Sequence, residues 1–154
     1  MTTIPRALAH WDFPAAHVVE VAVQPRDIDA YGHVNNSVYL TWLDHAAWSH
    51  SAALGIPLER CVGIRRGMAA QRIEIDYLRA ALTGDTVRVA TWIDTGDARL
   101  RVGRRFQLRR ALDGQTLARA KVDYVCINLE SGRATRMPPE FLAAYGVTAT
   151  RGPA

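Results

Sequence analysis

Residues 25–36 read PRDIDAYGHVNN, and the rest of the chain is organised around this stretch. It lies between a strand pattern at residues 17–24 and a helix pattern at residues 37–54. A loop that ends at the start of a helix gathers unpaired backbone N–H groups and the positive end of the helix dipole. Asp29 and His33 therefore stand where they can face a polarised carbonyl group or an anion.

The same residues also suit a purely structural role. Asp and Asn are favoured in turns and at helix N-caps because their short side chains bond to nearby backbone N–H groups. Asp27 can pair with Arg26 or cap a turn, and Asn36 can be the N-cap of the helix. For Asp29, the residue types alone leave a structural and a catalytic role open.

The helix pattern at residues 37–54 is the strongest in the chain. Its core stripe has apolar residues at helical spacing together with one histidine: Tyr39, Trp42, Leu43, Ala46, Ala47, His50, Ala53 and Leu54. Val38, Leu40 and Trp48 lie off the stripe, so the helix is apolar on more than one side. A helix that is apolar nearly all round is expected to be buried.

Five stretches predict strands. The first is residues 17–24, and the other four alternate apolar with polar residues at 71–78, 86–93, 99–108 and 117–127. Turn residues separate the last four strands, at 83–85, 95–97 and 113–114. Four strands joined by hairpins predict an antiparallel meander, so the element order is β-α-β-β-β-β. A sheet wrapped around one apolar helix buries the apolar face of each element.

The 154 residues predict a single α+β domain, 1–154, that is large enough for a core. Residues 1–16 contain two prolines and no clear period, which predicts an extended arm. Residues 137–154 predict a C-terminal extension that begins with a short helix at 137–145.

Composition narrows the class of protein. Hydrophobic content of 49% and charged content of 22% are ordinary for a soluble globular protein. The net charge of +4 comes from scattered arginines, which gives no reason to expect nucleic-acid binding and suits a phosphorylated carrier. Cys61 and Cys126 have no metal-site spacing, so free thiols in a reducing compartment are expected, with Cys126 in the core.

No targeting or membrane segment is expected. Residues 1–13 lack the apolar stretch of a signal peptide, and no run approaches the roughly 20 apolar residues of a membrane span. Cytoplasmic localisation is the expectation that follows.

Residues 26–44 carry a specific resemblance. DIDAYGHVNN, followed by Tyr39-Leu40 and Trp42-Leu43-Asp44, resembles the signature of hotdog-fold acyl-CoA thioesterases of the 4-hydroxybenzoyl-CoA thioesterase-like family. It is also similar to plant acyl-carrier-protein thioesterases. The resemblance implies a hotdog fold, in which an antiparallel sheet wraps around one long helix, and the predicted element order agrees with that fold.

The resemblance also implies roles for particular residues. In that family the second acid of the Asp-x-Asp pair is the catalytic carboxylate, which places this role on Asp29. His33 matches the histidine of the plant-like version, and Tyr31 stands where that version has Asn. Catalytic Asp29 and His33 are thus expected beside substrate-binding residues Tyr31, Asn35, Asn36 and Tyr39. The implied substrate is an acyl-CoA or acyl-carrier-protein thioester, and the implied assembly is a homodimer or homotetramer with sites between subunits.

Thioester hydrolysis needs a polarised carbonyl and either a nucleophile or an activated water. Asp29 can attack the thioester directly or act as general base on water, and the neighbouring His33 and asparagines favour the second route. His33 can orient that water, protonate the leaving thiolate, hold Asp29, or serve only as a structural hydrogen-bonding residue. Asn35 and Asn36 can position water or cap the helix.

Other chemistries find little support in the sequence. It has no G-x-S-x-G, Walker A or G-x-G-x-x-G motif, and His45 and His50 are five residues apart instead of the four of a helical zinc site. No metal and no cofactor are expected. Two alternatives stay open: a hotdog dehydratase or hydratase that uses Asp44, and a non-catalytic acyl-thioester-binding module.

Several side chains outside the loop allow two interpretations. His50 on the core stripe is expected to be structural. Trp42 and Trp48 suit either the core or a tunnel for an acyl chain. Arginines at 99, 101, 104 and 105 suit either a solvated strand face or a patch that grips the phosphates of coenzyme A.

Overall fold

The computed structural model describes residues 10–147. The outer parts of the predicted arm and C-terminal extension, residues 1–9 and 148–154, lie outside the described residues. The elements follow one another as β1 (His17–Ala22), the 3₁₀ turn η2 (Pro25–Asp27), α1 (Asn36–Ala53), α2 (Leu58–Ile64), β2 (Arg66–Tyr77), β3 (Thr86–Gly96), β4 (Arg101–Arg110), β5 (Thr116–Asn128) and α3 (Pro139–Ala144). The predicted order of one strand, one long helix and four strands is therefore confirmed, and α2 is an addition.

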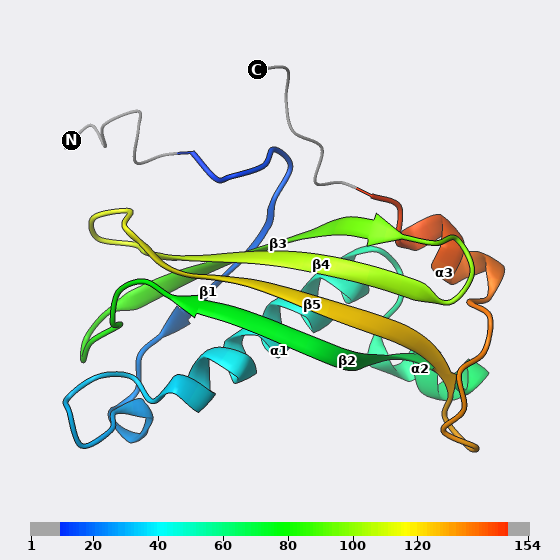
Figure 1. Cartoon of the computed structure of the whole chain (residues 1–154), viewed down its shortest axis with the longest axis horizontal. Coiled ribbons are helices and arrows are strands. Elements are labelled where there is room, and N and C mark those ends of the chain that lie inside the picture. The colour runs from blue at the N-terminus through cyan, green and yellow to red at the C-terminus, as the bar shows by residue number, and fades with distance from the viewer. Residues whose placement is uncertain (1–9, 148–154) are drawn as a thin grey trace.

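The five strands form one antiparallel sheet in the order β1-β3-β4-β5-β2 (Figure 1). The hairpins β3–β4 and β4–β5 agree with the predicted meander. The predicted hairpin between β2 and β3 is wrong, because β2 pairs with β5 along its length, from Arg66 opposite Asn128 to Tyr77 opposite Ala118. Residues 78–85 instead carry the chain from one edge of the sheet towards the other, since β3 already has β1 and β4 as neighbours.

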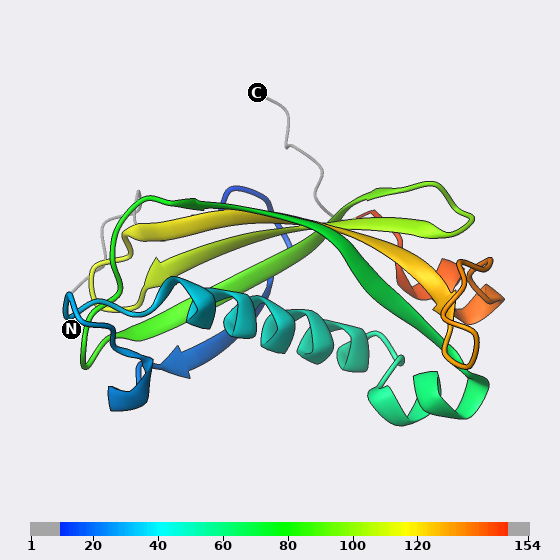
Figure 2. The ribbon, with the colours of Figure 1, turned by 60° about the horizontal axis from the view of Figure 1, so that its bottom comes forward.

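Helix α1 lies along one face of the sheet, as Figure 2 shows. Tyr39, Trp42, Leu43, Ala46 and Ala47 are buried in a core shared with the inward-facing residues of β3, β4 and β5. The expectation that the helix is buried nearly all round is wrong for the single chain. Leu40 is 38% exposed and Trp48 is 48% exposed, because the sheet covers one side of the helix only.

A second core cluster joins the end of the sheet to the short helices. Cys61 of α2, Cys126 of β5 and Phe141 of α3 are buried together, and both thiols are free. The expected burial of Cys126 is thus confirmed, and the short helix expected at 137–145 occurs as α3. Helix α2 has only seven residues, which is too short for its apolar residues to give a periodic signal in the sequence.

The predicted N-terminal arm lies against the sheet where it is described. The Asp12 backbone amide donates to Gln107 Oε1 at 2.9 Å, and the Trp92 indole N–H donates to the carbonyl oxygen of Pro14 at 2.9 Å. This cover explains why Gln107 is buried although its neighbours along β4 suggest a solvated face.

Candidate active site

Asp27 closes the first turn of the motif loop. The Gln24 backbone amide donates to Asp27 Oδ2 at 2.8 Å, and the Asn35 amide donates to the carbonyl oxygen of Asp27 at 2.7 Å. The carboxylate therefore caps the turn η2 at its start, which is one of the two structural roles expected for Asp27. The second bond ties the start of the loop to the start of α1.

Asp29 is held at one carboxylate oxygen and free at the other. Its Oδ1 accepts from the Tyr31 amide at 2.8 Å and from the His33 amide at 3.2 Å, while its own amide donates to the carbonyl oxygen of His33 at 2.7 Å. Gly32 turns the chain between them with a φ of 78°. Within residues 10–147, Oδ2 of Asp29 accepts no hydrogen bond. One oxygen thus fixes the carboxylate and the other is available.

The N-terminus of α1 lies next to this loop. Asn35 is the N-cap: its Oδ1 accepts from the Ser37 amide at 3.1 Å. The interpretation of Asn36 as N-cap is wrong by one residue, because Asn36 is the first residue of the helix. The Val38 amide donates to the carbonyl oxygen of Asn35, so the cap residue satisfies two donors of the first turn. The Asn36 amide finds no acceptor within residues 10–147 and is the first-turn donor left for a ligand.

Two tyrosines lie beside the helix start. The Tyr39 hydroxyl accepts from the Ala81 amide at 3.0 Å, and the Tyr77 hydroxyl donates to the carbonyl oxygen of Asn36 at 2.8 Å. Their rings meet edge to face with centroids 5.1 Å apart. Burial raises the pKa of both Tyr39 and Tyr77, so both phenols stay protonated at neutral pH.

These groups surround a cavity of about 350 Å³. Five of the six expected site residues line it: Asp29, Tyr31, His33, Asn36 and Tyr39. Asn35 does not, since its side chain is turned to the helix cap. Val34 and residues 77–80 complete the lining. Nothing in the sequence marks residues 77–80 as site residues, because the end of β2 and the start of the β2–β3 connection reach the loop only in the folded chain.

The cavity is open in the single chain. Tyr31 is 86% exposed, and the exposed His33 makes no side-chain hydrogen bond within residues 10–147. Leu78, which lines the same cavity, is 51% exposed.

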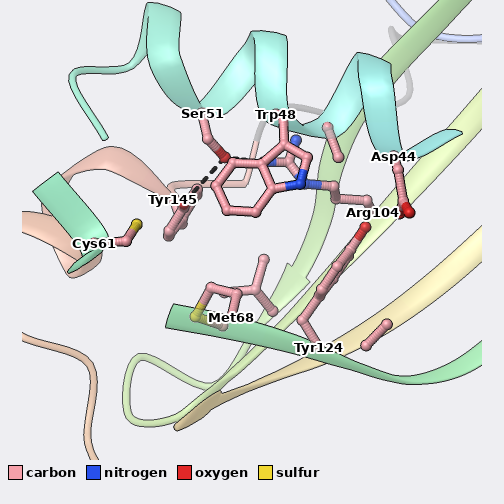
Figure 3. A pocket seen from close by; sticks show the side chains of 11 residues that line it. Asp44, Trp48, Ser51, Cys61, Met68, Arg104, Tyr124 and Tyr145 are labelled. Atoms are coloured by element: carbon pink, nitrogen blue, oxygen red, sulfur yellow. Dashed lines mark hydrogen bonds between the residues drawn. The ribbon is translucent and has the colours of Figure 1, made fainter. Parts of the chain in front are cut away.

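A second cavity, of about 260 Å³, lies further along α1. Asp44, Trp48 and Ser51 of α1 face Met68, Arg104, Tyr124 and Tyr145 across it (Figure 3). Burial raises the pKa of Asp44. Asp44 therefore lines a different cavity from His33, and no histidine of the described chain lines the cavity of Asp44. The dehydratase alternative needs a histidine and a carboxylate in one site, and the described chain does not bring such a pair together.

The expectation of a solvated arginine face is wrong for Arg104, which is only 3% exposed. Strand alternation explains it: residue 104 has the same parity as Val102, Phe106 and Leu108, so its side chain lies on the face that α1 covers. Arg105, on the opposite face, pairs with Asp94 at 2.7 Å. These two arginines therefore form no common surface patch for phosphates.

Two further observations concern other classes of site. No group of three or more His, Cys, Asp or Glu side chains in residues 10–147 is arranged to hold a metal ion. Over the same residues, no helix is long and apolar enough to cross a membrane.

The fold and the loop together define a class. An antiparallel five-stranded sheet with one long helix along it, and a carboxylate loop leading into that helix, is the hotdog architecture of thioesterases. A family model described as the thioesterase-like superfamily matches residues 23–145. The chain belongs to this superfamily, and the expected kind of enzyme, a thioester hydrolase, is confirmed at that level.

Individual relatives agree with this assignment. The chain is 23% identical over 121 residues to the long-chain acyl-CoA thioesterase FadM of Escherichia coli (strain K12), covering 79% of this chain and 90% of FadM. A 1,4-dihydroxy-2-naphthoyl-CoA thioesterase from Synechocystis superposes with a TM-score of 0.76 at 24% identity, over 84% of this chain and 95% of that one. A Staphylococcus aureus protein solved in complex with CoA superposes with a TM-score of 0.78 at 19% identity, over 84% of this chain and 80% of that one.

Proposed function

We propose that the protein hydrolyses acyl-CoA thioesters at the Asp29 loop. The observation that carries the proposal is that two groups with no partner among residues 10–147, the Oδ2 atom of Asp29 and the backbone amide of Asn36, belong to residues that line one cavity. The first group suits a general base, and the second suits the developing oxyanion of a thioester carbonyl.

The reaction follows from these two groups. The thioester oxygen accepts from the Asn36 amide, where the dipole of α1 favours negative charge. Water loses a proton to Asp29 Oδ2 as it attacks the carbonyl carbon. The carbonyl then re-forms as the C–S bond breaks, and the thiolate takes the proton held on Asp29 Oδ2 to leave as the thiol, which returns Asp29 to the carboxylate form. The two backbone bonds to Oδ1 keep the carboxylate oriented throughout.

The remaining expected residues have supporting roles in this proposal. His33 and Tyr31 border the mouth of the cavity, where they can orient the attacking water or the leaving thiol. Tyr39 is nearly fully buried and supports the floor. Coenzyme A is the proposed carrier because FadM is an acyl-CoA thioesterase, with an acyl-carrier protein as the alternative, and the proposed location is the cytoplasm, where Cys61 and Cys126 stay reduced.

We also propose that the working form is a homodimer or a larger homo-oligomer. Strand β2 is an edge of the sheet, and its residues Ile73 and Tyr77 are each 45% exposed. An uncovered apolar edge is an association surface. Tyr77 also lines the Asp29 cavity, so a second copy on this edge would help to close the open site.

An activity screen tests the proposed function. The purified protein is incubated with acyl-CoAs of several chain lengths, and free thiol is measured alongside the absorbance of an enoyl thioester. Thiol release is the expected result. Loss of the enoyl signal without thiol release would identify a hydratase, and binding without either change would identify a non-catalytic module. The same screen with acyl-carrier-protein substrates decides between the two carriers.

A further inference from the structure

The cavity beside α1 contains a buried charge that the proposed reaction does not use. The Nη1 atom of Arg104 donates to Nδ1 of His50 at 2.7 Å, and its Nη2 atom donates to Oγ of Ser51 at 2.9 Å. Its Cζ is 5.7 Å from the centre of the Tyr145 ring. Figure 3 shows Ser51 and Tyr145 at the same end of the cavity, joined by a hydrogen bond of 3.0 Å between their hydroxyls.

No carboxylate of residues 10–147 forms an ion pair with Arg104. Other arginines differ: the half-buried Arg110, for example, bonds to both Asp85 and Asp113 at 3.0 Å. An isolated buried cation is costly, and such groups are normally paired. Asp44 also lines the cavity, but it lies two helical turns before Ser51, about 10 Å along the axis of α1.

Within residues 10–147, the side chains that hydrogen-bond to the guanidinium are those of His50, Ser51 and Tyr145, and all are neutral. Burial, the nearby Arg104 and the stacked His17 lower the pKa of His50 to about 4, so its imidazole is uncharged at neutral pH. The charge of Arg104 is therefore not compensated by its own contacts. A guanidinium has five N–H donors, and the bonds to His50, Ser51 and the Tyr145 hydroxyl leave donors for a further acceptor.

The rest of the cavity is suited to an apolar body. Its lining also includes the apolar side chains of Ala47, Trp48, Met68, Ala70 and Val102. A ligand with a negative end and a short hydrocarbon or aromatic body fits this distribution of charge.

We propose that this cavity is a carboxylate-binding site, in which Arg104 and Ser51 hold the carboxylate of a ligand whose apolar body lies against Trp48 and Met68. Two sources share that chemistry. One is an acyl thioester with a second carboxylate at the far end of its acyl group, in which case the site sets substrate specificity and the inference rests on the proposed function. The other is a free carboxylic acid.

The first experiment measures binding and needs no activity. Titration calorimetry at pH 7 compares octanoate with octanol, which has the same chain and no charge. Octanoate is expected to bind at least about tenfold more tightly, and R104M is expected to remove that preference. R105M is the matched control, because Arg105 is the next residue of β4 and points to the other face; it should bind octanoate like the wild type.

Equal binding of octanoate and octanol, or octanoate binding that survives R104M, would overturn the proposal. Tyr145→Phe keeps the ring and removes only the hydroxyl, so it tests the same site with a milder change if R104M does not fold. It should weaken octanoate less than R104M and leave octanol binding unchanged, and an equal effect on both ligands would count against a carboxylate site.

The second experiment distinguishes the two sources. The kcat/KM values of acyl-CoAs are compared with those of the same chains carrying a terminal carboxylate, over a series of chain lengths. A preference of tenfold or more for one of the carboxylated chains, lost in R104M and kept in R105M, assigns the site to the acyl group. Octanoate binding without such a preference assigns it to a free acid. If no thioester is hydrolysed at all, the proposed function fails while the binding result still stands.

Discussion

Two hydrogen bonds join Asp29 and His33 across the turn that separates them. The Asp29 amide donates to the carbonyl oxygen of His33 at 2.7 Å, and the His33 amide donates back to Asp29 Oδ1 at 3.2 Å. This pair of bonds orients the carboxylate without using Oδ2. A structural and a catalytic role of Asp29 are therefore compatible, because each uses a different oxygen.

Gly32 makes this arrangement possible, so replacing it with Ala should destabilise the loop. Its φ of 78° lies in the left-handed region, and an added Cβ would meet no atom of residues 10–147 within 4 Å, so the cost of the substitution is conformational alone. We expect a loss of about 1 kcal/mol, measured by chemical denaturation. Gly63 in α2 is the control, since its Cβ position is also open but its φ is not positive, and Gly63→Ala should be neutral or stabilising. Equal losses in both variants would contradict the argument.

The exposed edge strand predicts association. Light scattering at micromolar concentration should give at least twice the mass of one chain. Ile73→Arg should shift the mass towards the monomer, because a charge would then lie on the apolar edge. Leu112→Arg is the matched control: Leu112 is 90% exposed in the turn between β4 and β5, and its replacement should leave the mass unchanged. A monomeric wild type would refute the predicted assembly.

His50 predicts a loss of stability in mild acid. Its folded pKa of about 4 lies below the ordinary value of 6.5, so between these values the unfolded chain binds a proton that the folded chain does not. The free energy of unfolding should fall as the pH drops from 6.5 towards 4, with His50 contributing at most about 1.4 kcal/mol per pH unit. His50→Gln cannot titrate and should show a shallower slope in denaturation measured across this range. An unchanged slope would show that His50 does not contribute.

The proposed general-base route predicts where an oxygen label goes. In a single turnover in heavy-oxygen water, with enzyme in excess, attack by water places the label in the product acid. If Asp29 attacks the thioester and the anhydride is hydrolysed at the enzyme carboxyl, the label appears on Asp29 and is detected by peptide mass. Label on Asp29 would overturn the general-base route. Label in the product alone agrees with it, and a trapping nucleophile then tests for attack at the acyl carbon of an anhydride.

Much of the fold follows from local patterns in the sequence. The helical spacing from Tyr39 to His50 and the alternation around Val87 and Phe106 each reflect one buried face, so the corresponding elements could be predicted. The pairing of β2 with β5 could not. A Gly-Asp turn before Thr86 is compatible with a hairpin and with a crossover, and only the whole sheet decides between them.

The same limit applies to the site. The loop residues are close in sequence, so their meeting at one cavity could be expected. Tyr77 at the end of β2 and the residues that follow it reach the cavity only in the folded sheet. Arg104 shows a different limit. Its parity with Val102 and Phe106 indicates the inner face of the sheet, but a charged residue on a core face is so rare that the sequence favours a solvated side chain.

The Oδ2 atom of Asp29 is proposed to act in the chemical step, and the steady-state kinetics of the Asp29→Asn variant measure its contribution. Asn keeps an Oδ1 acceptor for the Tyr31 and His33 amides, so the loop should hold its shape while the base is lost. We expect kcat to fall by roughly a hundredfold or more with little change in KM. Asp27→Asn is the matched control, because Asp27 caps the preceding turn, and it should lower stability more than kcat. An inactive Asp27→Asn beside a nearly wild-type Asp29→Asn would show that Asp29 is not the base.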